Sequence, residues 1–422
     1  MLRLYTFFGF HFPMKKALFL TGFAALSALL AGCNADKSRT PQQTLAQTWP
    51  QIEAAGKGQP VSMQMWMGDP LINKYMSTYV KPEVKRLYNI DLQISAGQGA
   101  GLAQTLAAEK EAGQPSEIDL AWINGETFYQ LRQVDALLGP FVEKLPNARY
   151  LDLQNPFINT DFQQPVAGME CPWGNVQFTF IYDSARVARP PRSFAELLAF
   201  LKTHPGQFTI PNEFTGMTLL KSWMMALSGD PKLFSGKFNE AVYTKWSGAL
   251  WQQINASRPY FWKQGQTFPE QLAPLHQLFA NGEVAFTFSN NDAEVDNKVN
   301  QGVFPRTARA YVPMPGTIQN SHYLGVVQGS QHPEAAMLVV NFLISPAAQL
   351  QKMDPNVWGD HTVLNLAALP AQQRQQFQQL PSRRYAPRRE SIQGLALAEP
   401  DPEYMARLFK DFRTHVIEAP AQ

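Results

Sequence analysis

The sequence predicts an α/β protein, because strand patterns and helix patterns alternate along the chain. Three stretches have the length and apolar pattern of strands: Val61–Trp66, Ile90–Ile94 and Ile118–Ile123. Each is followed by a loop that contains glycine and then by a stretch rich in helix-forming residues. This alternation is typical of βαβ units and of a parallel sheet.

The helices of this first part follow their strands closely. We expect them at Lys81–Tyr88, at Leu102–Ala112 and from Asn124–Glu126 through Leu131. A second part begins near Pro165. Its expected strands are Asn175–Tyr182, Gln207–Ile210, Val284–Phe288, Ala310–Val312 and Tyr323–Val327, and its expected helices are Phe194–Lys202, Met217–Leu227, Asn239–Ile254, Pro269–Asn281 and Pro333–Leu343.

The N-terminus predicts export. Met14-Lys15-Lys16 precedes an apolar run from Ala17 to Leu30, as in a secretory signal peptide, and Met14 is a plausible true start. The run is shorter than the ~20 apolar residues that span a membrane. Leu30-Ala31-Gly32-Cys33 is similar to the lipobox of bacterial lipoproteins, so we expect a lipid on Cys33; an ordinary cleaved signal is the alternative. Residues 1–32 are then the signal peptide, and residues 33–58 a polar tether.

The balance of charges argues against nucleic acid as a partner. Lys and Arg total 36 against 34 Asp and Glu, which gives no basis for binding nucleic acid. Cys33 and Cys171 are the two cysteines, so a lipid on the first leaves the second as a free, buried thiol. The remaining chain is long enough for two domains, and we expect it to be a monomer.

Motifs for bond chemistry are weak. Gly97-Gln98-Gly99-Ala100-Gly101 lies between a strand and a helix, but its glycine spacing differs from that of a dinucleotide site. We found no nucleophile elbow, no zinc-protease motif and no phosphate-binding loop, and the seven histidines lack metal-ligand spacing. The sequence therefore predicts no cofactor, no metal and no enzyme activity.

A binding function is indicated by the strand ends instead. Trp66-Met-Gly68-Asp69, Gln98-Gly99 and Trp122-Ile-Asn124-Gly-Glu126 each follow a strand and combine glycine with polar or aromatic residues. In an open α/β sheet, ligands bind outside the carboxyl ends of the strands. Core packing of each tryptophan is the alternative.

Six stretches of the sequence are distinctive when taken together: Trp66–Asn73, Asp119–Glu126, Leu145–Asn147, Met169–Gly174, Pro205–Phe208 and Glu399-Pro400. In these residues the chain resembles a known family, the periplasmic substrate-binding proteins of ABC importers, in their YnjB-like branch. The resemblance covers essentially the whole mature chain.

This resemblance implies the type II periplasmic-binding-protein fold: two lobes, each a mostly parallel sheet flanked by helices, joined by crossing hinge strands and closing over a solute. We expect residues 59–168 plus 318–345 in lobe 1 and residues 169–317 plus 346–418 in lobe 2. Asp161–Phe178 and Gly316–Tyr323 are the expected crossings. The expected partners are a small solute, the permease and ATPase subunits, and a membrane, reached through the lipid anchor from the periplasm or the outer face of the cytoplasmic membrane.

By analogy with that family, the ligand-binding residues are expected at loop tips and crossings. They are Trp66, Gly68, Asp69, Gln98, Gly99, Trp122, Asn124, Glu126, Glu170, Trp173, Asn290, Asn291, Asp292 and Tyr323. These loops carry carboxylates and no Lys or Arg, and tryptophan faces attract cations. We therefore expect a cationic or polyhydroxylated solute, such as a thiamine-like compound. An exported lipoprotein hydrolase that uses the same carboxylates is the alternative function.

Overall fold

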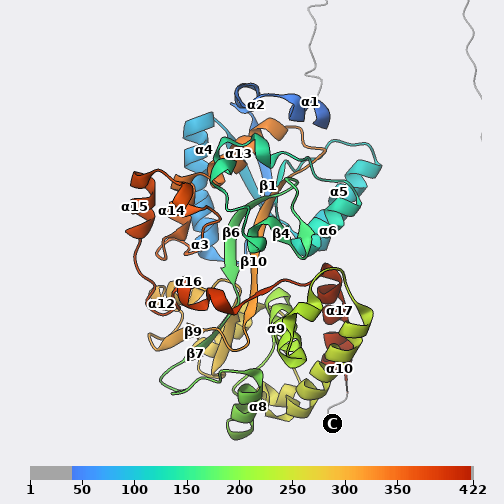
Figure 1. Ribbon diagram of the computed structural model, residues 1–422, viewed down its shortest axis with the longest axis vertical. Helices are drawn as coiled ribbons and strands as arrows, with labels where there is room; N and C mark the ends of the chain where they lie inside the picture. Colours follow the sequence, from blue (N-terminus) through green and yellow to red (C-terminus); the bar gives the residue numbers. More distant parts are fainter. Residues whose placement is uncertain (1–39, 420–422) are drawn as a thin grey trace, which may run out of the picture. The chain divides into compact units, whose positions relative to one another are not determined.

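A computed structural model describes residues 40–419, and the signal peptide, Cys33 and residues 34–39 lie outside the described residues. The α/β class is confirmed: helices flank two main sheets, and β4 and β5 pair as a small third sheet (Figure 1). The strands are β1 (Pro60–Met65), β2 (Asp91–Ala96), β3 (Leu120–Ile123), β4 (Thr160–Asp161), β5 (Gln164–Pro165), β6 (Cys171–Gln177), β7 (Thr179–Asp183), β8 (Phe286–Ser289), β9 (Ala308–Tyr311), β10 (Thr317–Val326) and β11 (Ala396–Ala398).

The α-helices cover both parts of the chain. They are α1 (Pro41–Ala46), α2 (Trp49–Gly56), α3 (Pro70–Tyr75), α4 (Lys81–Tyr88), α5 (Gly99–Glu111), α6 (Gly125–Gln133), α7 (Pro156–Asn159), α8 (Phe194–Thr203), α9 (Phe214–Ser228), α10 (Glu240–Ser257), α11 (Leu272–Ala280), α12 (Glu294–Asn300), α13 (Pro333–Leu343), α14 (Pro346–Met353), α15 (Ala371–Gln378), α16 (Arg389–Ile392) and α17 (Pro402–Phe412). Among residues 40–419, no single helix is long and apolar enough to cross a membrane, and α13 with α14 meets that test only as a pair bent by 57°.

The first sheet has the order β2-β1-β3-β10-β11, and β6 also pairs with β10. β1 is parallel to β2 and β3, whereas β10 is antiparallel to β3 and β6. Side chains of this sheet alternate between two cores. In β3, Leu120 and Trp122 face one side of the sheet, and Ala121 and Ile123 face the other. Helices α5 and α6 cover the second side, and the apolar helix α13 covers the first.

The second sheet has the order β8-β7-β9, and both pairings are antiparallel. The prediction of a mostly parallel sheet is therefore wrong for this part of the chain. Gln207–Ile210, which was expected to be a strand, forms no strand, although Gln207 O accepts a hydrogen bond from Ala285 N at 2.9 Å.

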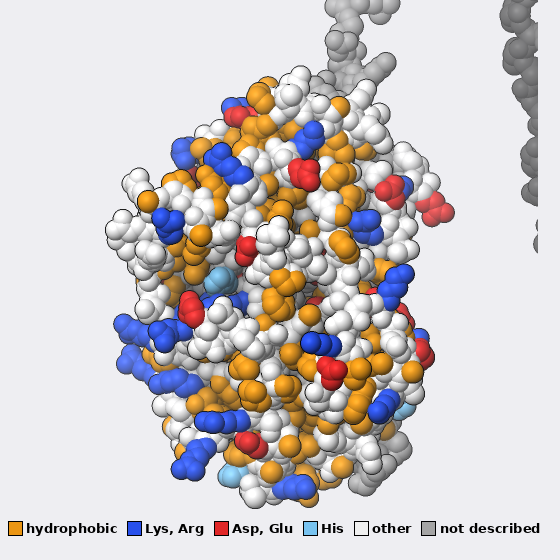
Figure 2. Space-filling model, viewed as in Figure 1, with side chains coloured by type: hydrophobic (Ala, Val, Ile, Leu, Met, Phe, Trp, Pro, Cys, Tyr) orange, Lys and Arg blue, Asp and Glu red, His pale blue; other side chains and the backbone are white. Residues whose placement is uncertain are grey.

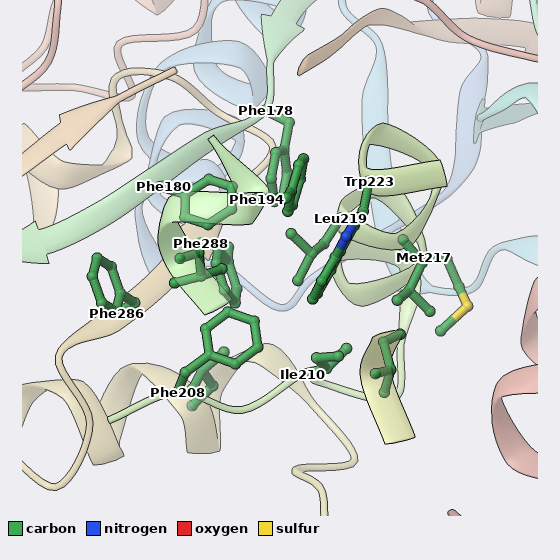
Figure 3. Packing of buried hydrophobic residues seen from close by; sticks show 14 of the residues in the cluster. Phe178, Phe180, Phe194, Phe208, Ile210, Met217, Leu219, Trp223, Phe286 and Phe288 are labelled. Atoms are coloured by element: carbon green, nitrogen blue, oxygen red, sulfur yellow. The ribbon is translucent and has the colours of Figure 1, made fainter. Parts of the chain in front are cut away.

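Aromatic residues fill the core around the second sheet (Figure 3). Phe180 of β7 meets Phe288 of β8 edge to face at 4.9 Å between ring centroids, and Phe194 of α8 stacks on Trp223 of α9 at the same distance. Such pairs add to the stabilisation that burial of the rings provides. This core is distinct from the two that flank the first sheet, which is the physical basis for two lobes.

Three segments of the described chain pass between the two lobes. β6 lies in the first sheet, and β7 begins two residues after it in the second. Near the start of β10, Ile318 lies in the core around the second sheet, and near its end Leu324 and Val326 lie in a core of the first sheet. These two segments correspond to the two predicted crossings. The third was not predicted: it runs from Leu380, which packs against the core of the first sheet, to Tyr385, which packs against the core around the second sheet.

Two predicted boundaries differ from the packing. Ala348, Trp358, Val363 and Phe377 belong to the core of the first sheet, so the segment around α14 and α15 packs with lobe 1, where lobe 2 was expected. The described part of the predicted tether is also folded: α1 and α2 are helices, and Ile52 is buried in the same core. Apolar side chains at Ile52 and Trp49 explain this, because a helix of the tether can bury them against α13.

Candidate functional site

The loop after β1 places three predicted residues at the tip of the first sheet. Trp66 is 39% exposed, and its ring lies so close to Gly68 that a Cβ there would be 2.5 Å from the ring. Asp69 caps α3, since its Oδ1 accepts hydrogen bonds from the amides of Leu71 (2.7 Å) and Ile72 (3.2 Å). Its Oδ2 lies 3.0 Å from Nζ of Lys298, on α12 of the second lobe.

The loop after β2 leads into the N-terminus of α5. Gln98 is exposed and is the residue immediately before the helix. Gly99 has a φ of +62°, a conformation that favours glycine. Open space surrounds the position that a Cβ of Gly99 would occupy. This tip therefore offers backbone amides and an amide side chain to its surroundings.

The loop after β3 brings Asn124 and Glu126 to the start of α6. Asn124 Oδ1 accepts a hydrogen bond from Trp122 Nε1 at 3.2 Å, which orients the asparagine. Glu126 is partly buried; burial raises the pKa of its carboxyl, Lys221 opposes this and Glu399 adds to it. Within residues 40–419 the Glu126 carboxylate forms no hydrogen bond and no ion pair, which leaves it able to accept one.

Trp122 and Trp173 belong to a buried aromatic cluster. Their rings meet edge to face at 4.9 Å, and both also contact the rings of His322 and Trp358. Trp122 is 6% exposed and Trp173 is fully buried. These two tryptophans therefore pack as core residues beneath the β1 and β3 tips, and Trp66 is the predicted tryptophan that reaches solvent.

Glu170 and Tyr323 are also buried. The Tyr323 hydroxyl donates to the carbonyl oxygens of Ile158 (3.2 Å) and Thr160 (3.3 Å). Both carboxyl oxygens of Glu170 lack a hydrogen-bond partner. Burial raises the pKa of Glu170 well above its usual range, and Asp161 raises it further.

The loop after β8 supplies the second lobe's predicted residues. Asn290 Nδ2 donates to Thr215 Oγ1 at 3.1 Å, and Asn291 Oδ1 accepts from the amide of Ala293 at 3.0 Å. Both are partly exposed, whereas Asp292 is buried. Asn290 thereby joins this loop to the N-terminus of α9.

Asp292 forms ion pairs with Arg383 and with Arg389, the latter at 2.6 Å. Burial works against its charge, but the two guanidinium groups hold its pKa well below the usual range. Figure 2 shows basic side chains gathered along one side of this face near α12 and α16, where Arg384 and Arg388 are exposed. The loops that carry Asp69 and Asp292 contain no Lys or Arg, and both acids pair with basic residues that are distant in sequence.

Three charged residues near these tips were not predicted as site residues. Lys298 pairs with Asp69, and Lys221 is fully buried in an ion pair with Glu399. Glu213 caps α9 by accepting from the amides of Thr215 (2.9 Å) and Gly216 (3.2 Å). The capping role of Glu213 was readable from its place before an apolar helix, whereas the two lysines had no local signal.

Other potential sites lie elsewhere or have a structural role. A cavity of about 220 Å³ lies beside α5 and the end of β10, and none of the predicted site residues lines it. Within residues 40–419, no group of three or more His, Cys, Asp or Glu is arranged to hold a metal ion. Cys171 is a free, buried cysteine, and burial raises the pKa of its thiol.

Comparison with solved structures confirms the fold. AfuA, a periplasmic binding protein from Actinobacillus pleuropneumoniae with fructose-6-phosphate bound, aligns with a TM-score of 0.60 and 12% identity over 86% of this chain and 99% of its own. A periplasmic thiamin binding protein aligns with a TM-score of 0.57 and 16% identity over 85% of this chain and 96% of its own.

Sequence comparison identifies the family. Protein YnjB of Escherichia coli (strain K12) is 35% identical over 340 residues, which are 79% of this chain and 87% of YnjB. Residues 79–379 match the model of the bacterial extracellular solute-binding proteins. The chain therefore belongs to the bacterial extracellular solute-binding protein family.

Proposed function

We propose that this protein captures a small solute between its two lobes and delivers it to the permease and ATPase subunits of an ABC importer. The observation that carries the proposal is that the β1 tip of the first lobe meets α12 of the second, through Asp69 and Lys298 at 3.0 Å. Loops at the strand ends of one lobe thus face the other lobe. Three crossing segments, which are β6–β7, β10 and residues 380–385, connect the lobes and are suited to act as a hinge.

The mechanism is binding without bond chemistry. A solute that contacts both lobes stabilises the closed form over the open form by the difference between its affinities for the two. Micromolar affinity corresponds to about −8 kcal/mol, which several hydrogen bonds and one aromatic contact can supply after ordering costs. The permease then recognises the closed form.

We propose a cationic or polyhydroxylated solute, such as a thiamine-like compound. Of the four predicted acids, Asp69 and Asp292 have basic partners and Glu170 is buried, which leaves Glu126 as the partly exposed carboxylate. The exposed ring of Trp66 offers a face to a cation. The fold itself does not select the solute, since one structural neighbour binds thiamin and another was solved with fructose-6-phosphate.

The polar loop tips complete the proposed site. Gly68, Gln98, Gly99 and Asn124 supply hydrogen-bonding groups from the first lobe, and Asn290 and Asn291 supply them from the second. Trp122, Trp173, Tyr323 and Asp292 are buried, so we propose structural roles for them and no solute contact. Glu170 is also buried, so it is not proposed as a solute contact.

We further propose that the protein works outside the cytoplasm, in the periplasm or on the outer face of the membrane, anchored by a lipid on Cys33. Replacing Cys33 with serine should move the protein from the membrane fraction to the soluble fraction. Retention of the variant in the membrane fraction would contradict the anchor and leave the binding proposal unaffected.

Isothermal titration of the purified protein tests the function. The panel contains thiamine, spermidine, neutral sugars, phosphate and sulfate. We expect one cation or polyol to bind with micromolar affinity and to be recovered unchanged. Binding of an oxyanion alone would overturn the solute class, and conversion of a bound compound would favour a hydrolase instead.

A further inference from the structure

Asp69 was expected to contact the solute, but its two carboxylate oxygens are already engaged. Oδ1 accepts from the first amides of α3, and Oδ2 forms the ion pair with Lys298. The side chains of Asp69 and Lys298 are 13% and 12% exposed, so water screens the pair only partly. The pair joins a loop of the first lobe to a helix of the second.

Each partner also has a second contact within its own lobe. Asp69 retains the N-terminus of α3, which stabilises a negative charge. Lys298 lies 3.3 Å from Glu294, one turn earlier on α12. Separation of the lobes therefore leaves neither charge buried without a partner, and the interlobe pair is able to break and re-form at low cost.

The surroundings of Lys298 favour its charged form. Burial opposes the charge of Lys298, but Glu294 and Asp69 outweigh it and raise the lysine pKa. His276 Nδ1 lies 4.0 Å from Glu294, and burial lowers the pKa of this histidine. The lysine is thus the cation that faces Asp69.

A second contact from the same helix supports the pair. Asn297 Nδ2 donates to the carbonyl oxygen of Trp358, whose side chain packs in the core of the first sheet. Two consecutive residues of α12 therefore contact the first lobe. This makes α12 the element of the second lobe that closure brings against the β1 tip.

We propose that the Asp69–Lys298 ion pair is a latch that favours the closed arrangement of the lobes with or without solute, and that Asp69 is a latch residue in place of a solute ligand. The inference rests on the proposed capture of solute between two lobes. It predicts that a fraction of the solute-free protein is already closed. The free energy needed to close the lobes on binding is then smaller, and the apparent affinity for solute is higher.

The first test needs no solute. Small-angle scattering is measured on the wild type, on Asp69→Asn, on Lys298→Met and on the double variant. Asparagine preserves the helix cap and removes the charge. We expect each single variant to enlarge the radius of gyration, through a roughly two- to tenfold rise in the open-to-closed ratio, and the double variant to add nothing further.

Glu83→Gln is the matched control, since it breaks an ion pair with Arg86 within α4 and leaves the lobe contact intact. Its radius of gyration should equal that of the wild type. Equal radii for all variants, or additive effects of the two single variants, would overturn the latch.

The second test uses whichever compound the titration panel identifies. A latch predicts that Asp69→Asn and Lys298→Met weaken its affinity by the same factor. A solute-contacting Asp69 predicts a large loss in Asp69→Asn with no loss in Lys298→Met, and that result would also overturn the proposal. If no compound binds, the capture function fails while the scattering result still decides the latch.

Discussion

At the scale of single residues, the buried carboxyls of this protein divide into paired and unpaired groups. Asp292 has two arginine partners, whereas Glu170 has no hydrogen-bond partner for either oxygen. Their pKa values are displaced in opposite directions for that reason. Two pH effects of opposite sign follow.

Glu170→Gln should raise the free energy of unfolding relative to the wild type, and this gain should be larger at pH 8 than at pH 5. Because the folded-state pKa of Glu170 is raised, the folded form holds a proton that the unfolded chain releases above about pH 4.3, so stability falls as pH rises. For each unit by which the folded-state pKa of Glu170 exceeds its unfolded value, removing the carboxyl should add about 1.4 kcal/mol to the free energy of unfolding at high pH. Urea unfolding at both pH values measures this, with Glu143→Gln, at an exposed position, as the control. A gain that is equal at both pH values would contradict it.

Asp292→Asn should destabilise the protein by about 3–5 kcal/mol at pH 7, since it strands two largely buried guanidinium groups. The depressed pKa of Asp292 means that its contribution is present above about pH 3.9 and is lost as pH falls through the folded-state value. The difference from the wild type should therefore shrink in acid. Chemical unfolding from pH 7 to pH 3 checks it, and Glu240→Gln, in an exposed ion pair, should change stability by less than about 1 kcal/mol.

The residue scale also shows what sequence can and cannot place. Trp66, Gln98 and Asn124 lie at strand ends, where a local pattern puts them. The partners of Asp69 and Asp292 lie 229 and 91 residues further along the chain, and no local pattern encodes those encounters. The balance of charge in the site was therefore beyond local sequence reasoning.

At the scale of elements, the close approach of α2 and α13 depends on one glycine. A Cβ at Gly56 would lie 2.8 Å from the backbone of Glu334 and Ala335. Gly56→Ala should therefore destabilise the protein by about 1–3 kcal/mol. The same substitution at Gly248, exposed within α10 and with open space around it, should instead stabilise by about 0.5–1 kcal/mol.

Thermal or urea unfolding of both glycine variants measures the pair of effects. Opposite signs are the expected result, because one position is crowded by backbone and the other is limited only by helix propensity. Destabilisation of both variants to the same extent would show that crowding at Gly56 is unimportant.

The sequence predicted where strands lie better than whether they pair in parallel or antiparallel. β1, β2 and β3 follow one another through short helices, so their parallel pairing was predictable. β7 instead pairs with β8 and β9, which lie more than 100 residues later. Periodicity marks such segments as strands, but the path of the intervening chain decides their direction.

At the scale of the whole molecule, solute should act on the lobes together. A compound at a hundred times its Kd should stabilise the protein by about 2.7 kcal/mol and reduce its radius of gyration. Differential scanning fluorimetry and scattering on the same sample check the two effects. Stabilisation with an unchanged radius would place the compound on one lobe only.

Cys171 has a practical consequence for following such motion. Its thiol is buried and its pKa is raised by burial, so reagents that need an accessible thiolate will leave it unmodified. In a chain whose Cys33 has been replaced, a cysteine installed at exposed Ala100, which follows the β2 tip and is not a proposed solute contact, would be the reactive one among the described residues. An environment-sensitive dye attached there would report optically on solute binding beside the β2 tip.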